Sequence, residues 1–201
     1  MSKEVKSLKE NDTYDLVLLP DDQSVIGGRW VFANKLGPDG EKYHMARYVA
    51  KGYSQVHEVD YLETFSPTPR RTTFRAIMNK AVQENMIVHQ MDFDMAYLNA
   101  DLDIDVYVKQ PDGFVEEPNM VWKLKKSLYG LKQSGRMWNK LLNKFLTSEG
   151  FVRSMTDPCL YTYFDGKNTV NIIVWVDDLL IAARNQQIWI KLKVYVTKLQ
   201  N

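Results

Sequence analysis

Hydrophobic residues recur along this chain with two different periods, and the periods predict helices in some segments and strands in others. Apolar residues spaced three to four apart, as on one face of a helix, occupy positions from about 73 to 82 and from about 136 to 149. Thr73 is the expected N-cap of the first helix, and Gly150 ends the second. A further helix is predicted for 187–199, and a short one for 95–102.

Short apolar runs bounded by turn residues predict strands. They cover 30–36, 43–51, 87–92, 106–108, 160–164, 169–176 and 179–183, and turns at 37–40 and 165–166 join neighbouring runs into hairpins. Residues 1–28 are expected to be a polar lead-in. Because helices and strands mix without a Gly-rich phosphate loop or a repeat, the expected class is α+β, or a mixed sheet with helices on one face.

Composition narrows the class of protein. With 201 residues, of which 45% are hydrophobic and 25% charged, the chain matches a soluble globular protein and is neither disordered nor collagen-like. The single Cys159 excludes an internal disulfide and a multi-cysteine zinc site, and is expected to be a small buried hydrophobe. The first residues lack the apolar core of a secretory signal, and the longest apolar stretch, 171–183, is too short to span a bilayer. We therefore expect a soluble protein of a reducing compartment, without membrane contact.

The net charge of +1 conceals a local asymmetry. Residues 92–117 contain eight acids and one base, whereas 120–153 contain eight bases and one acid. A second basic cluster, from Arg70 to Lys80, contains no acid. Such runs are usually solvated faces. Alternating acidic and basic segments would also suit a protein that holds metal ions beside a polyanion.

Two adjacent carboxylates interrupt the apolar segment 172–181 and predict a tight hairpin with Asp177 and Asp178 at its tip. An ordinary β-turn is the alternative, because Asp is common in turns. Turn aspartates usually lie beside Gly, Asn or Pro, however, and here bulky apolar residues flank the pair. Adjacent carboxylates repel unless a cation neutralises them, and Mg²⁺ takes one or two carboxylates plus substrate phosphates.

A third carboxylate, Asp92, ends the predicted strand 87–92. By itself it would be interpreted as a helix N-cap. Together with a carboxylate pair on a neighbouring hairpin, it matches a two-metal centre for phosphoryl transfer, in which the ions clamp the attacking and leaving oxygens.

Ordered motifs along the whole chain resemble the reverse transcriptase domain of Ty1/copia-type LTR retrotransposons. Segments 4–8, 30–32, 46–55 and 60–67 are similar to its fingers region, and 89–92, 96–99, 101–102 and 110–114 to its first catalytic motif and the segments after that motif. The run LKKSLYGLKQ at 124–133, with Arg136 and Trp138 after it, resembles the family's most diagnostic segment. Segments 157–161 and 176–178 complete the series.

The resemblance implies a right-hand polymerase fold with palm and fingers, a mixed or antiparallel palm sheet with helices on one face, and no thumb. Residues up to about 88 would be mainly fingers, and about 89–201 mainly palm with an interleaved fingers segment. The implied activity is RNA-directed DNA polymerisation: two-metal nucleotidyl transfer from a dNTP to a primer 3′-hydroxyl, on an RNA or DNA template.

The resemblance also implies roles for individual residues. Asp92, Asp177 and Asp178 would bind two Mg²⁺ ions, with Mn²⁺ as a substitute, and Tyr97 would reject a ribose 2′-hydroxyl. Arg47 and Lys51 would meet the triphosphate, and Gln133 would line the nucleotide pocket. The basic residues expected to contact nucleic acid are Lys125, Lys126, Lys132 and Arg136. Without the resemblance, Tyr97 would be interpreted as helix packing, Gln133 as a surface amide, and Met137 and Trp138 as core.

The sequence departs from the family's pattern at four positions: Trp175 replaces a usual Tyr, Met45 a Lys, Gly135 a Pro and Ala100 a Gly. None of these changes removes a predicted metal ligand. Two alternatives to an active polymerase stay open. One is a non-enzymatic remnant that binds nucleic acid through its basic segments, and the other is a different two-metal phosphotransferase such as a nuclease.

The sequence matches no thumb, RNase H or integrase segment of a Pol polyprotein. We therefore expect primer extension by this chain to be weak, distributive or absent. The parent element's particle would place the protein in the cytoplasm, with the nucleus as an alternative.

Overall fold

The computed structural model describes residues 1–37, 39–93 and 95–184. The chain forms two compact units: Met1–Thr64 with Tyr97–Met137, and Phe65–Ala96 with Trp138–Asn201. Within the described ranges, no helix is long and apolar enough to cross a membrane. Helices and sheets occur in both units, so the expected mixed α+β class is confirmed.

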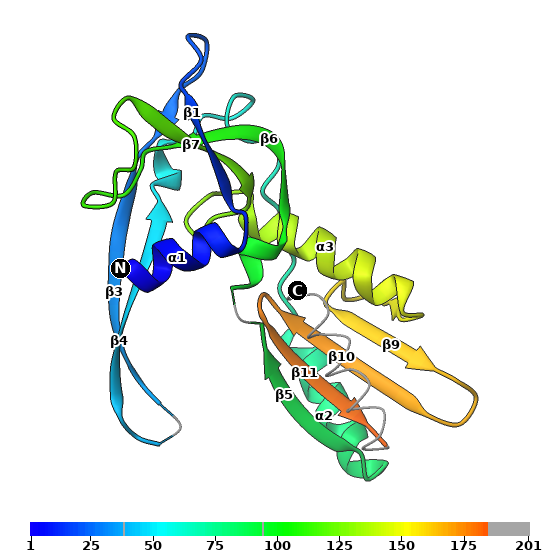
Figure 1. Ribbon diagram of the computed structural model, residues 1–201. Coiled ribbons are helices and arrows are strands. Elements are labelled where there is room, and N and C mark those ends of the chain that lie inside the picture. Colours follow the sequence, from blue (N-terminus) through cyan, green and yellow to red (C-terminus); the bar gives the residue numbers. More distant parts are fainter. Residues whose placement is uncertain (38, 94, 185–201) are drawn as a thin grey trace. The chain divides into compact units, whose positions relative to one another are not determined.

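The first unit contains a four-stranded sheet and a two-stranded ribbon (Figure 1). The sheet has the order β1-β7-β6-β2, with β2 parallel to β6 and the other neighbours antiparallel. Its strands are β1 (Tyr14–Leu18), β2 (Val25–Ile26), β6 (Asp101–Val108) and β7 (Met120–Lys126). The ribbon pairs β3 (Gly28–Leu36) with β4 (Lys42–Ala50), and helix α1 (Ser2–Glu10) packs against β4.

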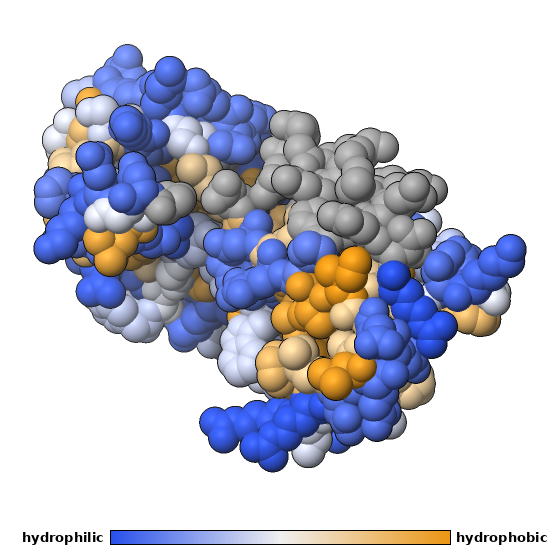
Figure 2. Space-filling model, turned by 90° about the horizontal axis from the view of Figure 1, so that it is seen from below, coloured by the Kyte–Doolittle hydropathy of each residue, from blue (hydrophilic) through white to orange (hydrophobic). Residues whose placement is uncertain are grey.

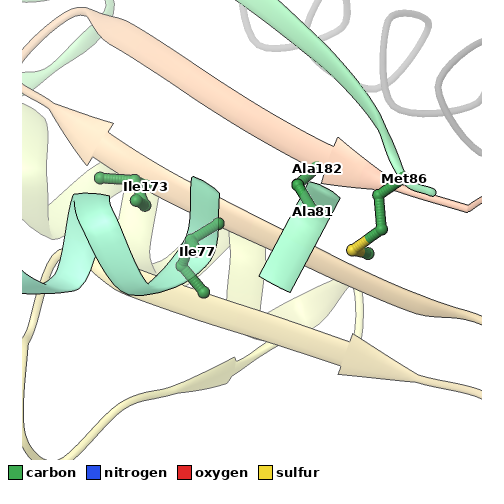
Figure 3. Packing of buried hydrophobic residues seen from close by; sticks show 5 residues of the cluster. All are labelled: Ile77, Ala81, Met86, Ile173 and Ala182. Carbon is green, nitrogen blue, oxygen red and sulfur yellow. The ribbon is translucent and has the colours of Figure 1, made fainter. Parts of the chain in front are cut away.

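The second unit contains an antiparallel sheet of the order β5-β11-β10-β9-β8. Its strands are β5 (Ile87–Asp92), β8 (Val152–Arg153), β9 (Leu160–Phe164), β10 (Thr169–Trp175) and β11 (Asp178–Ala183). Helix α2 (Arg71–Gln83) packs on this sheet: Figure 3 shows Ile77 and Ala81 facing Ile173 and Ala182, with Met86 beside them. Burial of these apolar side chains holds the helix to the strands.

Helix α3 (Ser134–Ser148) begins in the first unit and continues into the second. Trp138, Leu142 and Leu146 recur every four residues and are each 1% exposed, as the helical period requires. The prediction that Met137 and Trp138 are core residues is therefore confirmed. Cys159 is fully buried as expected, and burial raises the pKa of its thiol to about 11.

An aspartate distant in sequence caps α2. The prediction that Thr73 is the N-cap is wrong, because the helix begins at Arg71 and its N-cap residue is Arg70. The backbone N–H of Arg70 donates a hydrogen bond to the Asp157 carboxylate at 2.9 Å. Burial of Asp157 would raise its pKa, but bonds from the Thr73 side chain and from the backbone of Arg70 and Cys159 outweigh that effect. The pKa of Asp157 is therefore lowered.

Two further expectations are corrected, and one strand was not predicted. Residues 1–28 are not a lead-in, because α1, β1 and β2 lie there. Residues 95–102 form one 3₁₀ turn, Ala96–Asn99, and then enter β6, whose aspartates at 101, 103 and 105 alternate with apolar residues as in a strand. Strand β7 was not predicted, because its outward lysines conceal the inward Trp122 and Leu124. The predicted helix 187–199 lies outside the described residues.

Some large apolar side chains remain at the surface of the second unit. They include Phe74, Val82 and Trp175, and Figure 2 shows one face on which hydrophobic residues gather beside hydrophilic ones. Trp175 is 53% exposed and ends β10, next to the aspartates that the sequence singles out.

Candidate active site

The predicted aspartate pair lies at a tight hairpin, as expected. Strand β10 ends at Trp175, which pairs with Asp178, the first residue of β11. Only Val176 and Asp177 remain as the loop, and Val176 has a φ of 59°. A positive φ at the first loop position suits the twist of a two-residue hairpin, but a β-branched side chain avoids that region. The loop therefore holds a strained residue immediately before Asp177.

Both carbonyl groups of this loop accept hydrogen bonds from buried residues. The indole Nε1–H of Trp138 donates to the Val176 carbonyl at 2.7 Å, and the backbone N–H of Phe93 donates to the Asp177 carbonyl at 3.1 Å. The rings of Phe93 and Trp138 contact each other edge to face, with centroids 4.7 Å apart. The loop is thus attached both to α3 and to the residue immediately after Asp92.

Strand register brings the third aspartate to the same end of the sheet. In the antiparallel pair β5–β11, Asp92 lies directly opposite Asp178, and residues so paired have Cβ atoms about 4.5–5.5 Å apart on one face. The Gln90 amide donates a hydrogen bond to Asp178 Oδ1 at 3.1 Å. Asp92 is exposed, and Asp177 and Asp178 are half-buried. All three carboxylates can therefore be reached from solvent.

The donor set suits a hard divalent cation. Mg²⁺ prefers oxygen ligands and commonly takes one or two carboxylates, completing its coordination with water and substrate phosphates. The opposed Asp92 and Asp178 supply such a pair. In the part of the chain that the structure describes, no group of three or more His, Cys, Asp or Glu side chains is arranged to hold a metal. The geometry thus fits a two-carboxylate site, and the binding of metal by these residues stays a prediction.

A basic cavity lies in the first unit. Its volume is about 410 Å³, and its lining includes Arg29, Arg47 and Lys51 together with Tyr53 and Tyr129. Arg47 and Lys51, which the sequence predicts to meet a triphosphate, therefore line one cavity, and Arg29 adds a third positive charge. Three cations around one cavity favour a polyanionic ligand.

Tyr129 links two residues of the predicted nucleotide site. The Arg47 guanidinium carbon lies 3.8 Å from the centroid of the Tyr129 ring, and the Tyr97 ring lies 4.7 Å from it on a tilt of 50°. The Tyr129 carbonyl accepts a hydrogen bond from the Ala50 N–H at 2.8 Å. A Cβ at the next residue, Gly130, would collide with the Ala50 carbonyl, so glycine permits this close approach.

Sequence reasoning did not single out Tyr129. Its signal was an aromatic residue directly before a glycine, within a run already recognised as diagnostic.

Gln133 is 1% exposed, so it is not a surface amide. Its amide nitrogen donates to the Asp60 carbonyl at 2.8 Å, and its oxygen accepts from the Gln55 amide at 2.9 Å. The Gln55 oxygen in turn accepts the Lys132 backbone N–H at 2.7 Å. Gln133 is absent from the residues that line the basic cavity described above. Its predicted contact with a nucleotide stays a prediction, and its observed bonds join residues 55–60 to 132–133.

The four basic residues predicted to contact nucleic acid all make contacts within the first unit. Lys125 pairs with Asp12 and Asp15 at 2.6 and 2.9 Å, and these bonds raise the pKa of Lys125. Lys126 pairs with Asp101 at 2.6 Å, Arg136 pairs with Glu63 at 2.8 Å, and Lys132 lies over the Tyr61 ring. Exposed pairs of this kind are weak, so phosphate could replace the carboxylates.

Comparison with known proteins shows the family of this chain. A family model described as "Reverse transcriptase (RNA-dependent DNA polymerase)" matches residues 11–199. The retrovirus-related Pol polyprotein from transposon RE1 of Arabidopsis thaliana is 41% identical over 92% of this chain and 13% of its own length. The corresponding polyprotein from transposon TNT 1-94 of Nicotiana tabacum is 37% identical over 98% of this chain and 15% of its own.

The similarity extends to yeast. The transposon Ty1-GR3 Gag-Pol polyprotein of Saccharomyces cerevisiae is 31% identical over 99% of this chain and 12% of its own length. The chain thus spans only about an eighth to a seventh of the length of these curated relatives.

Proposed function

Because this chain belongs to the reverse transcriptase (RNA-dependent DNA polymerase) family, as found in copia-type transposon Pol polyproteins, we propose that it is an RNA-directed DNA polymerase domain. It would transfer nucleotides from dNTPs to the 3′-hydroxyl of a primer on an RNA or DNA template. The observation that carries the proposal is the register that sets Asp92 opposite Asp178, with Asp177 in the adjoining loop.

The second unit would act as the palm and the first as the fingers. In the palm, Asp92, Asp177 and Asp178 would hold the divalent ions. When bound, these ions supply Lewis-acid activation of the primer hydroxyl and neutralise phosphate charge. The exposed Trp175 ring, immediately before the loop, would lie against the primer end.

In the fingers, the cavity lined by Arg29, Arg47 and Lys51 would receive the triphosphate. Arginine and lysine donate charge-assisted hydrogen bonds to phosphate oxygens, and these bonds are shorter and stronger than neutral ones. Tyr97 would contact the sugar and exclude a 2′-hydroxyl by its bulk. Lys125, Lys126, Lys132 and Arg136 would exchange their internal partners for backbone phosphates of the template and primer.

Primer extension on an RNA template tests this function. The chain is expected to add dNTPs to a labelled primer weakly and distributively in Mg²⁺ or Mn²⁺ but not in EDTA, and Asp177→Asn should lose this activity with little loss of folded structure. Asp165→Asn is the matched control, since Asp165 lies in the turn at the far end of β10. Its carboxylate accepts hydrogen bonds from the backbone N–H groups of residues 167 and 168, and an asparagine oxygen can accept them too. Because processive extension is not expected of this chain, the absence of even a single nucleotide addition by the parent would contradict the proposal, and metal-dependent cleavage of the template would favour a nuclease instead.

A further inference from the structure

We propose that Trp138 is a positioning residue: its indole N–H holds the Val176–Asp177 loop, and thereby the Asp177 carboxylate, in one geometry. The kinetic consequence rests on the proposed polymerase function. The structural consequence does not, because it concerns only contacts within the second unit.

The loop needs a restraint because of Val176. Its φ of 59° lies in the left-handed region, which β-branched side chains occupy only when the surrounding structure forces it. The residue after Val176 carries a predicted metal ligand. A relaxed Val176 would turn the following peptide and move the Asp177 side chain.

The Trp138 indole provides such a restraint. It is 1% exposed and lies on the face of α3 that also buries Leu142 and Leu146, so its position is fixed by the helix. From there, Nε1–H donates to the carbonyl of Val176 itself at 2.7 Å. A strained peptide is thus bonded to a rigid anchor, a buried tryptophan packed on a helix.

A second bond closes the loop from the other side. The Phe93 N–H donates to the Asp177 carbonyl at 3.1 Å, and the Phe93 ring contacts the Trp138 ring. Phe93 is the residue directly after Asp92. Trp138 therefore contacts both segments that carry the predicted ligands, and its loss should disturb their relative placement. A displacement of about 1 Å at a reacting centre can cost about a hundredfold in rate.

Simple core packing is the competing explanation for Trp138, and the test must separate the N–H from the ring. Trp138→Phe removes the donor and keeps an aromatic ring. Trp122→Phe is the matched control, because Trp122 is equally buried and its Nε1 finds no hydrogen-bond partner among the described residues. Both substitutions remove the same atoms from a buried site, but only one removes a bond to the loop.

The first measurement is amide hydrogen exchange of the 201-residue chain by NMR. In Trp138→Phe, the Phe93 amide should exchange up to about tenfold faster, as the loss of one buried hydrogen bond predicts. The Phe151 amide, which donates to Leu146 at the end of α3, should keep its rate, and Trp122→Phe should change neither. An unchanged Phe93 rate, or equal acceleration at Phe93 and Phe151, would overturn the positioning role.

The second measurement is single-nucleotide addition. Trp138→Phe should lower kcat by about tenfold or more while the KM for dNTP stays within about twofold, since the interaction acts on the reacting geometry and not on nucleotide binding. Trp122→Phe should resemble the parent. If the parent itself adds no nucleotide, the proposed function fails while hydrogen exchange still decides the inference.

Val176→Gly provides a rescue. Glycine adopts positive φ without strain, so the double variant Trp138→Phe/Val176→Gly should recover much of the Phe93 protection. The double variant also serves if Trp138→Phe alone does not fold. If the Phe93 amide exchanges as fast in the double variant as in Trp138→Phe, the indole acts through packing, and the inference is overturned.

Discussion

Asp92 and Asp178 face each other across one antiparallel ladder although they lie far apart in the sequence. Like charges placed directly opposite on neighbouring strands destabilise a sheet. A divalent ion bound between the two carboxylates would relieve this repulsion, because it attracts both. A local arrangement that costs stability in the bare protein and that a ligand relieves is typical of binding sites.

Tyr129 gives a prediction at the scale of one side chain. Its ring lies against Arg47 at 3.8 Å, and such a cation–π contact is worth about 0.5–2 kcal/mol. Tyr129→Leu should therefore weaken the binding of inorganic tripolyphosphate by about two- to thirtyfold, measured by calorimetry, because Arg47 loses its orientation.

Tyr129→Phe is the control for that experiment. It keeps the ring over which the guanidinium lies and should bind tripolyphosphate nearly as the parent does. Equal losses of affinity in Tyr129→Leu and Tyr129→Phe would assign the effect to the hydroxyl. Unchanged affinity in both variants would show that Tyr129 does not contribute to tripolyphosphate binding.

Single residues also show what sequence alone could provide. The three aspartates could be selected because apolar strands end at them, and Arg47 and Tyr97 because they occupy family motifs. The bond from Trp138 to Val176 could not be predicted, since it depends on where α3 meets a hairpin tip. For the same reason Gln133, without the family resemblance, would be interpreted as a surface amide, whereas its amide is buried between Gln55 and Asp60.

At the scale of elements, α2 depends on a cap from outside its own segment. The Arg70 N–H bonds to the Asp157 carboxylate, which belongs to the turn before β9. Asp157→Ala should lower the free energy of unfolding by about 1–2 kcal/mol near neutral pH, measured by urea denaturation. Asp157→Asn, which keeps an acceptor oxygen, should cost less.

The pH dependence arises from the lowered pKa of Asp157. A carboxyl whose pKa is depressed by folding stabilises the protein above its unfolded value, 3.8, and loses that contribution as the pH falls through the folded value. The difference between parent and Asp157→Ala should therefore persist from neutral pH down to about 4 and then narrow. A difference that stays constant through acidification would show that the charge contributes nothing.

Elements with a dense apolar period were predictable from sequence, and sparse or charged ones were not. Helix α3 has large apolar residues on every turn of one face, so its period is unmistakable. Helix α1 buries only Val5 and Leu8 among seven polar residues, and its stability comes from packing on β4. Strand β7 has the period of a strand, but its lysines favour interpretation as a charged, solvent-exposed segment. Tertiary burial, which sequence does not display, decided both cases.

At the scale of the whole molecule, the chain interleaves its two units. Each is built from two separate stretches of sequence, so neither unit could be cut out as one continuous segment. The predicted ligands Asp92, Asp177 and Asp178 all belong to the second unit, whereas Arg29, Arg47, Lys51 and Tyr129 belong to the first. Substitutions in the two groups of residues therefore change different units of the chain.

Thermal unfolding of the whole chain should reveal the metal site even without polymerase activity. A ligand that binds only the folded state stabilises it by mass action, by about 1.4 kcal/mol at tenfold excess over Kd. For a chain of this size that corresponds to a rise in Tm of about 3–6 °C. Asp92→Asn should abolish most of this rise, because it removes one of two opposed carboxylates.

In EDTA the melting temperature of Asp92→Asn should no longer lie below that of the parent. Without metal, the Asp92 charge repels that of Asp178, so Asp92→Asn should melt at the same temperature as the parent or slightly above it. With Mg²⁺ the order should reverse, the parent melting higher, at ionic strength matched with NaCl. Asp165→Asn, at the far end of β10, should behave as the parent does under both conditions. An equal rise in Tm on adding Mg²⁺ to the parent and to Asp92→Asn would show that the metal does not bind at this pair of strands. That result would remove the main structural support for the proposed polymerase.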